Sequence, residues 1–286
     1  MSTVRRARPF ALAFAVAALL AGCGPAFNQS GAPSRTPTAA APGSTGAATP
    51  SASTPTPTAT PTPTASAVVV LDPGHNGGNA GAPSVINRPV PAGGFLKPCN
   101  TTGTETNAGY PEHAFTFDVA QRTAALLEAR GIKVVLTRPN DVGVGPCVDR
   151  RAATANTAGA ALAVSIHADG AAAGVRGFHV IEPARAPDGG NQGVLAASGK
   201  AALDLRAAFA AATGEPPATY PGALVSAGLT RRNDLAGLNL ARVPAVFIEC
   251  GNMRNATDAA EVTAPAWRQQ AAQGIADGIL TFLNAQ

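Results

Sequence analysis

Hydrophobic positions follow two different periods along the chain from residue 67 onward. Short apolar runs typical of buried strands occur at residues 68–71, 132–137, 162–166, 177–182 and 245–249. Between them, apolar residues recur every three or four positions, as in Phe115, Val119 and Leu126. This spacing predicts a long helix ending near Gly131, a short one at 151–158, an alanine-rich one at 190–213 and a closing one at 266–283.

The alternation of strands and helices predicts the fold class. Strands separated by helices of this length favour an α/β domain, with a mostly parallel twisted sheet and helices on both faces. We expect one such domain over residues 67–286. In open parallel sheets, ligands bind outside the carboxyl ends of the strands, so that edge is where functional residues are expected.

The first 66 residues have a different pattern. Arg5, Arg6 and Arg8 precede an apolar run at 10–20 that is about half as long as a membrane-spanning helix requires. The run ends in Leu20-Ala21-Gly22-Cys23, which resembles the lipobox of bacterial lipoproteins. It implies a signal peptide at 1–22, lipidation of Cys23, and export to the outer face of the cytoplasmic membrane or the periplasm. An ordinary secretory signal with an accidental cysteine is the alternative.

Residues 23–66 consist almost entirely of Ala, Thr, Pro, Ser and Gly. Such a segment has little apolar surface to bury and cannot offset the entropy of ordering. We therefore expect a lipid-anchored linker that holds the folded domain away from the membrane.

The charge distribution excludes one class of partner. The chain carries a formal charge of +4, but four of its 21 basic residues lie in the first 66 positions, which contain no acid. The remaining 17 basic residues balance all 17 acidic ones. A neutral domain lacks the positive surface that nucleic-acid binding requires, so we expect no nucleic-acid partner.

Four protonatable residues are expected at the carboxyl edge of the sheet. His75, His167 and Glu249 follow or close three predicted strands, and Glu112 opens the long helix. Two histidines and one glutamate with an open position are a recurring catalytic zinc set, and a second carboxylate supplies a general base. Each residue also has a structural explanation: histidines are common in loops, and the helix dipole favours an acid at position 112.

Two further histidines compete as ligands. His113 follows Glu112 on the same helix, where neighbouring side chains diverge by about 100°, so the two are not expected to share a metal. His179 falls within a predicted strand, where a structural role is favoured.

Three motifs carry a family resemblance: Leu71-Asp72-Pro73-Gly74-His75, Ser165-Ile166-His167-Ala168-Asp169 and Pro244-Ala245-Val246-Phe247-Ile248-Glu249-Cys250-Gly251. In order and type they resemble those of the zinc-dependent N-acetylmuramoyl-L-alanine amidases of the amidase_3 type, secreted bacterial enzymes that cut peptidoglycan. The resemblance covers the whole folded domain, including Arg151 on the helix before Ser165. It implies a zinc ion (Zn2+) bound by His75, Glu112 and His167, with Glu249 as the catalytic acid/base.

The sequence departs from the family pattern after Gly251. Asn252 stands where the family usually has an aromatic residue, and Arg254 where a small hydroxyl residue is common. These two positions are candidate substrate contacts. The Gly- and Pro-rich segment 76–111 forms either a flap bordering the cleft or a surface excursion.

The remaining cysteines fit an exported protein. Cys99 and Cys147 each follow a proline in predicted loops, which favours a disulfide over two free thiols. Cys250 continues a buried strand and is expected to stay reduced.

We expect a monomer that acts on peptidoglycan or its muropeptide fragments. Two alternatives remain open from the sequence. A zinc carboxypeptidase on stem peptides would use similar ligands but would need an arginine for the terminal carboxylate. A catalytically silent wall-binding relative would keep the fold and lose a ligand or the base.

Overall fold

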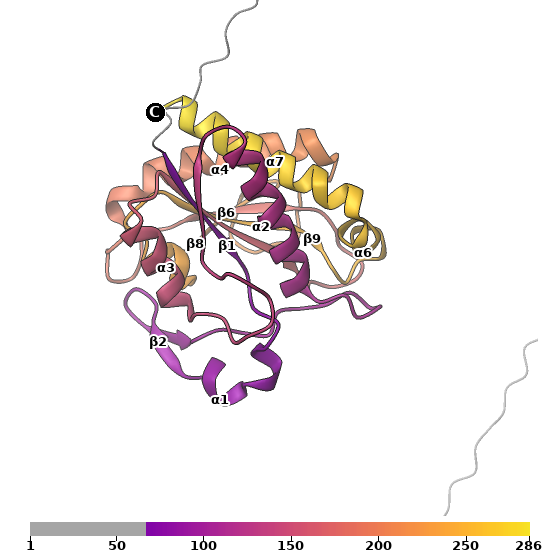
Figure 1. Cartoon of the computed structure of the whole chain (residues 1–286), viewed down its shortest axis with the longest axis horizontal. Coiled ribbons are helices and arrows are strands. Elements are labelled where there is room, and N and C mark those ends of the chain that lie inside the picture. The colour runs from indigo at the N-terminus through magenta and orange to yellow at the C-terminus, as the bar shows by residue number, and fades with distance from the viewer. Residues whose placement is uncertain (1–66) are drawn as a thin grey trace, which may run out of the picture. The chain divides into compact units, whose positions relative to one another are not determined.

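A seven-stranded sheet forms the centre of the computed structural model, which describes residues 67–286 (Figure 1). The predicted signal peptide, the lipidation site Cys23 and the linker lie outside the described residues. The strand order is β4-β1-β5-β9-β6-β8-β7. The bounds are β1 Val68–Pro73, β4 Lys133–Leu136, β5 Leu162–Asp169, β6 His179–Pro183, β7 Leu224–Ser226, β8 Leu229–Arg232 and β9 Ala245–Asn252.

Strands β4, β1, β5 and β9 run parallel, as predicted, and carry the carboxyl edge of the sheet. Strand β6 runs antiparallel to β9, while β8 is parallel to β6 and the edge strand β7 is antiparallel to β8. The connection at 170–178 explains the reversal, because a parallel return requires a crossover of a dozen or more residues. The sheet is therefore mostly, but not wholly, parallel.

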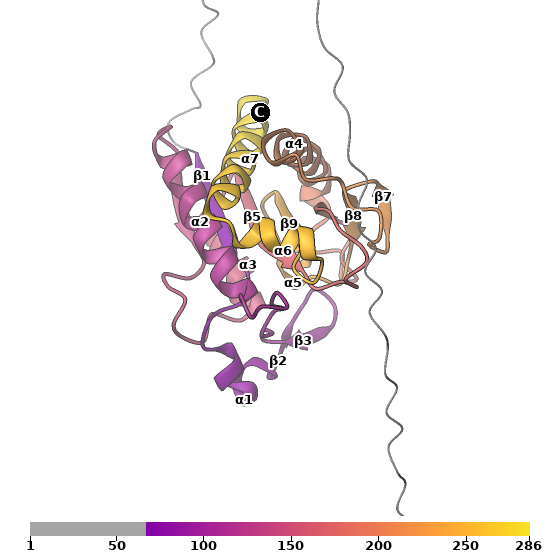
Figure 2. The same cartoon turned by 90° about the vertical axis from the view of Figure 1, so that its right-hand side faces the viewer.

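Helices cover both faces of the sheet, as expected (Figure 2). The larger core lies on the face under α2, α4 and α7, and the opposite face carries the shorter α3 and α5. The helix bounds are α1 Pro83–Ile86, α2 Glu112–Glu128, α3 Val148–Thr157, α4 Leu195–Thr213, α5 Ala236–Asn239, α6 Ala256–Thr263 and α7 Pro265–Asn284. Within residues 67–286, no helix combines the length and apolarity needed to cross a membrane.

Helices α4 and α7 pack closely because α7 carries glycines at the contact. A Cβ atom at Gly274 or Gly278 would come within 2.8 or 2.6 Å of the backbone Cα atoms of Phe209 and Leu205. The carboxyl end of α4 is closed by Gly214, which adopts the left-handed conformation (φ 70°) that glycine tolerates best.

The alternation of side chains along the strands separates core residues from site residues. In β5, Val164 and Ile166 enter the larger core, whereas Ser165 and His167 point to the opposite face. In β9, Ile248 lies in the larger core and Glu249 faces the other way. The site residues therefore lie on the face of the sheet that carries α3 and α5, opposite the larger core.

The segment 76–111 lies at the carboxyl edge of the sheet and carries α1 and the hairpin of β2 (Pro89–Pro91) and β3 (Leu96–Pro98). Figure 2 shows these elements at the end of the molecule opposite the chain's carboxyl terminus. A Cys99–Cys147 disulfide ties the segment to the start of α3, which confirms the predicted pairing. Cys250 is the buried free cysteine among residues 67–286.

Several predicted boundaries were wrong. Helix α3 begins at Val148 rather than 151, and α4 begins at Leu195 because a short 3-10 turn occupies 192–194. His167 lies inside β5 rather than after it, and His179 is the first residue of β6. The short elements β7, β8, α5 and α6 were not predicted, since segments of three to eight residues carry little periodic signal.

Candidate active site

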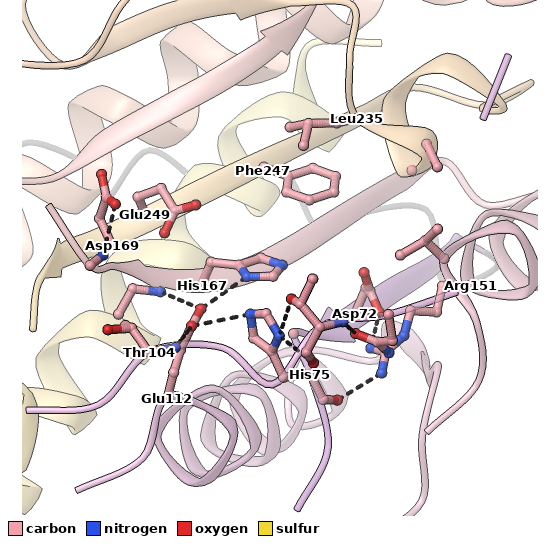
Figure 3. A pocket seen from close by; sticks show the side chains of 18 of the residues that line it. Asp72, His75, Thr104, Glu112, Arg151, His167, Asp169, Leu235, Phe247 and Glu249 are labelled. Atoms are coloured by element: carbon pink, nitrogen blue, oxygen red, sulfur yellow. Dashed lines mark hydrogen bonds and ion pairs between the residues drawn. The ribbon is translucent and has the colours of Figure 1, made fainter. Parts of the chain in front are cut away.

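His75, Glu112 and His167 converge at the carboxyl edge of the sheet. Glu112 Oε2 lies 3.1 Å from His75 Nε2, and Glu112 Oε1 lies 3.0 Å from His167 Nδ1. One ligand atom from each residue lies within 4.8 Å of the others. Figure 3 shows the three side chains directed toward one another. Two imidazoles and one carboxylate in this arrangement fit a tetrahedral metal that keeps one open position.

Backbone donors hold Glu112 in place at the first turn of α2. The amide of Thr104 donates to Oε2 at 2.9 Å, and the amide of Ala168 donates to Oε1 at 3.2 Å. Burial alone would raise the pKa of Glu112, but His75 and His167 lower it well below its usual range. The carboxyl is therefore ionised, as a metal ligand must be.

A hydrogen bond to Thr101 orients the ring of His75. Its Nδ1 lies 3.1 Å from the carbonyl oxygen of Thr101, which can only accept a hydrogen bond, so Nδ1 carries a proton and Nε2, which faces Glu112, is the nitrogen available to a metal. The backbone of His75 is left-handed (φ 61°), an uncommon conformation that surrounding structure must impose. At Gly74, any Cβ would collide with the imidazole of His167.

Two buried arginines hydrogen-bond to the carbonyls around that backbone conformation. Arg151 donates to the carbonyls of Pro73 and His75 at 2.7 Å, and Arg138 donates to the carbonyl of Pro73 at 2.9 Å and that of Gly74 at 3.3 Å. Arginine suits this task because its planar guanidinium offers several fixed donors.

Asp72 balances the charge of Arg151. Its Oδ1 lies 2.8 Å from Arg151 Nη1, and hydroxyls of Ser165 and Thr137 donate to it at 2.7 and 2.5 Å. Burial alone would raise the pKa of Asp72, but Arg151 and these hydroxyls lower it to about 2. Asp72 is therefore a structural anion beside the site.

Glu249 differs from the other carboxylates around the site. It pairs in register with His167 across β5 and β9, yet its Oε2 is buried with no hydrogen-bond partner among residues 67–286. Burial raises the pKa of Glu249 to about 8, with Glu112 and Asp169 adding to the shift and His167 opposing it. A buried carboxyl with an unpaired oxygen and a pKa near neutrality is suited to proton transfer.

These residues line a cleft of about 290 Å³. Asp169 and Glu249 lie on one side of His167, and Asp72 and Arg151 lie on the other (Figure 3). Phe247 stacks on the ring of His167, with centroids 5.3 Å apart, and forms an apolar wall with Leu235. Lys97, Pro98 and Asn100 of the segment 76–111 also line the cleft, so this segment borders the site.

The competing histidines lie outside the cluster. His113 Nδ1 contacts Asp141 Oδ2 at 2.6 Å and is not part of the cluster. His179 is buried beside Glu249, as its register partner across β6 and β9. A second acidic group, formed by Glu215, Asp258 and Glu261, pairs with Arg176 at 2.7–3.1 Å.

The two candidate substrate contacts are placed differently. Asn252 is fully buried, and its side-chain amide donates to the carbonyls of Ala172 and Val175 at 2.9 and 2.7 Å. This position gives it a structural role in the loop after β5. Arg254 is partly exposed and reaches the carbonyl of Glu105 at 3.4 Å, and its contact with substrate stays a prediction.

Sequence reasoning missed the residues beside Glu249. Asp169 accepts a hydrogen bond from the Tyr220 hydroxyl at 3.1 Å, and both line a second cavity. The signal for Asp169 was its place two residues after His167 on the same strand. Tyr220 lies in a loop, where no hydrophobic periodicity predicts the position of a side chain.

An α/β sheet with a His-Glu-His cluster and a separate buried glutamate at its carboxyl edge is typical of a metal-dependent hydrolase. The Amidase_3 family model, described as N-acetylmuramoyl-L-alanine amidase, matches residues 69–281. The chain belongs to this family.

Relatives at moderate identity share the whole folded domain. The N-acetylmuramoyl-L-alanine amidase Rv3717 of Mycobacterium tuberculosis is 43% identical over 223 residues, covering 77% of this chain and 87% of that protein. The crystal structure of Ami1 from Mycobacterium smegmatis has 45% identity and a TM-score of 0.71, covering 77% and 98% of the two chains. Apo Ami1 from Mycobacterium abscessus has 43% identity and a TM-score of 0.69, covering 76% and 99%.

Proposed function

We propose that this protein is a zinc-dependent N-acetylmuramoyl-L-alanine amidase that cleaves the amide joining N-acetylmuramic acid to L-alanine in peptidoglycan or its muropeptides. The observation that carries the proposal is the cluster of His75, Glu112 and His167 beside Glu249, whose buried Oε2 has no partner among residues 67–286. Family membership supports the amide-cleaving activity.

The donor set favours zinc. When bound, zinc polarises the scissile carbonyl and increases the acidity of a water molecule. His75 would hold the metal through Nε2, because its Nδ1 is engaged by Thr101. Glu112 would supply a carboxylate oxygen that Thr104 and Ala168 already orient. Ligands held by such outer partners keep their geometry when substrate arrives.

Glu249 would move the proton. Its Oε2 would accept the proton from the attacking water and then donate it to the leaving amine of L-alanine. The raised pKa of Glu249, caused mainly by burial, favours the second of these transfers. A divalent cation opposes that shift and so favours the carboxylate needed for the first. Phe247 and Leu235 form an apolar part of the adjoining wall.

The carboxypeptidase alternative is weakened by the state of Arg151. That reaction needs a free arginine for the terminal carboxylate, and Arg151 is the arginine among the residues that line the cleft. Its guanidinium already donates to Asp72 and to the carbonyls of Pro73, His75 and Pro146. The presence of all four candidate groups also argues against a silent wall-binding relative.

Product analysis tests the reaction. Purified protein incubated with intact peptidoglycan should expose new L-alanine amino termini without new reducing sugars. Release of carboxyl-terminal D-alanine would favour the carboxypeptidase. Binding without any product from zinc-loaded protein would favour the silent relative.

We further propose that the protein is exported and anchored through lipid on Cys23, and that it acts as a monomer. The support for the anchor is the motif Leu20-Ala21-Gly22-Cys23. Growth of the expressing host with a labelled fatty acid should tag the wild type and leave Cys23→Ser unlabelled. Labelling of both would contradict the assignment. Light scattering of the purified protein tests the oligomeric state: a mass in solution of one chain is expected, and a multiple of it would contradict the monomer.

A further inference from the structure

Asp141 lies between the two chain segments that carry His75 and Glu112. His75 stands in the turn after β1 and Glu112 opens α2, so these two candidate ligands come from different elements, with the segment 76–111 between them (Figure 3). Their side chains must nevertheless meet at one metal ion. Asp141, in the loop after β4, contacts a neighbour of each.

One oxygen of Asp141 holds the His75 side. Its Oδ1 accepts a hydrogen bond at 3.1 Å from the amide of Gly77, two residues after His75. Gly77 packs so closely here that a Cβ atom on it would come within 1.9 Å of the Asp141 carbonyl oxygen. The amide of Gly78 then donates to the carbonyl of Gly143 at 2.9 Å. The turn after β1 is thus fixed against the loop after β4 at two consecutive residues.

The other oxygen of Asp141 holds the Glu112 side. Its Oδ2 lies 2.6 Å from Nδ1 of His113, the residue next to Glu112 on α2. The buried Arg138 adds a second connection. Its Nη1 donates to Asp141 Oδ1 at 2.9 Å, and its Nη2 donates to the carbonyls of His113 and Gly74 at 2.8 and 3.3 Å. Asp141 is therefore linked to both ligand-bearing segments, directly and through this guanidinium.

Ordering two ligands before the metal arrives increases metal affinity. A side chain that is free to move must be ordered when the metal binds, and the entropy lost at that step weakens binding. His167 is already ordered by its place in β5, which pairs with β1 on one side and β9 on the other. His75 and Glu112 share no such ladder, so contacts between their segments must set the spacing of the two side chains.

We propose that Asp141 is a positioning residue of the metal site, which fixes the spacing of His75 and Glu112 without touching the metal. This inference rests on the proposed zinc site and adds to it a residue that controls zinc affinity. Asp141 is not among the residues that line the cleft, so proton transfer by Glu249 should not depend on it.

Zinc affinity tests the inference, measured by competition with a calibrated chelator at a temperature where circular dichroism shows every apo variant to be folded. Asp141→Ala should bind zinc about 10–100-fold more weakly than the wild type, the usual cost of losing an outer partner of a ligand. Asp141→Asn should recover most of that affinity although it removes the charge, because an amide oxygen can still accept from Gly77 and Arg138. Asp118→Ala is the matched control, since that aspartate of α2 also pairs with two arginines and should leave zinc affinity unchanged.

Gly77→Ala tests the same contact without changing any charge, and it decides the question if Asp141→Ala fails to fold. Its Cβ should push the Asp141 loop away and weaken zinc binding. Gly81→Ala is its control, because a Cβ there meets nothing within 4 Å, and it should bind zinc as the wild type does. At saturating zinc, each variant should regain turnover close to that of the wild type, since the loss lies in affinity.

Equal zinc affinities in the wild type, Asp141→Ala and Gly77→Ala would overturn the inference. An Asp141→Asn variant as weak as Asp141→Ala would also overturn it, because the loss would then come from the unpaired charge of Arg138. A wild type that binds no zinc would overturn the inference together with the proposed metal site. A wild type that binds zinc and cleaves no peptidoglycan would refute the amidase function alone, and the affinity comparison would still decide the role of Asp141.

Discussion

Arg151 Nη2 donates a hydrogen bond to the carbonyl oxygen of His75 at 2.7 Å, so a buried arginine holds the backbone of a candidate metal ligand. A second arginine, Arg138, donates hydrogen bonds to the preceding carbonyls of Pro73 and Gly74. These hydrogen bonds hold the three consecutive carbonyls that lead into and include the left-handed residue His75. We therefore expect the metal site to depend on a residue that contacts no metal.

Arg151→Lys tests this dependence. Lysine keeps the charge opposite Asp72 but cannot reach three carbonyls at once, so zinc affinity should fall about 10–100-fold, the usual cost of losing an outer partner of a ligand. Competition with a calibrated chelator measures it. Arg150→Lys, one residue away and 78% exposed, is the control and should bind zinc normally. Equal affinities in the two variants would refute the positioning role.

The ligand assignment predicts a difference between neighbouring histidines. His75→Ala and His167→Ala should each lose most bound zinc, measured by metal analysis of purified protein. His113→Ala should keep it, because that ring contacts Asp141 rather than the cluster. Full zinc retention in both His75→Ala and His167→Ala would overturn the assignment.

Acid should destabilise the domain through Asp72. Its pKa is about 2 in the folded protein against an ordinary pKa of 3.8, so the carboxylate contributes stability above pH 4 that is lost as the pH falls toward 2. The shift corresponds to about 2 kcal/mol. Urea unfolding at a series of pH values should show this loss in the wild type.

Asp72→Asn provides the comparison. The variant should be less stable at neutral pH, because Arg151 then lacks its anion, and its stability should fall less between pH 4 and 2. Parallel stability curves for the two proteins in that range would contradict the role of Asp72.

The sequence predicted that certain residues near the carboxyl ends of the parallel strands would lie together, while their roles stay predictions. His75, His167 and Glu249 were found because each adjoins a strongly apolar run, and the parallel register of β1, β5 and β9 brings such positions together. Glu112 has a weak local motif and was placed only as the first residue of the helix predicted from the spacing of Phe115 and Val119.

Contacts between distant loops could not be predicted in this way. No local sequence pattern predicts that the Thr101 carbonyl accepts a hydrogen bond from His75, or that the Tyr220 hydroxyl donates one to Asp169. The antiparallel direction of β6 was also not predicted. The connection at 170–178 is too short for a parallel return, but its length is known only once the true ends of β5 and β6 are known. His179 and Glu249 are neighbours because β6 runs antiparallel to β9.

Reduction of the Cys99–Cys147 disulfide should destabilise the domain. The bridge closes a loop with a sequence separation of 48, for which the chain-entropy model gives about 4 kcal/mol. A reductant should lower the melting temperature of the wild type and leave Cys99→Ser/Cys147→Ser unchanged, as measured by thermal unfolding. Free thiols at both positions in exported protein would show that the bridge does not form.

Glu249→Gln tests the central claim most directly, because it separates proton transfer from metal binding. Zinc content and the release of L-alanine amino termini from peptidoglycan should be measured on the same preparation. We expect near-normal zinc with turnover reduced by roughly 100-fold or more, the scale of losing a general acid–base. Loss of zinc would make Glu249 a ligand, and undiminished turnover would show that another group carries the proton.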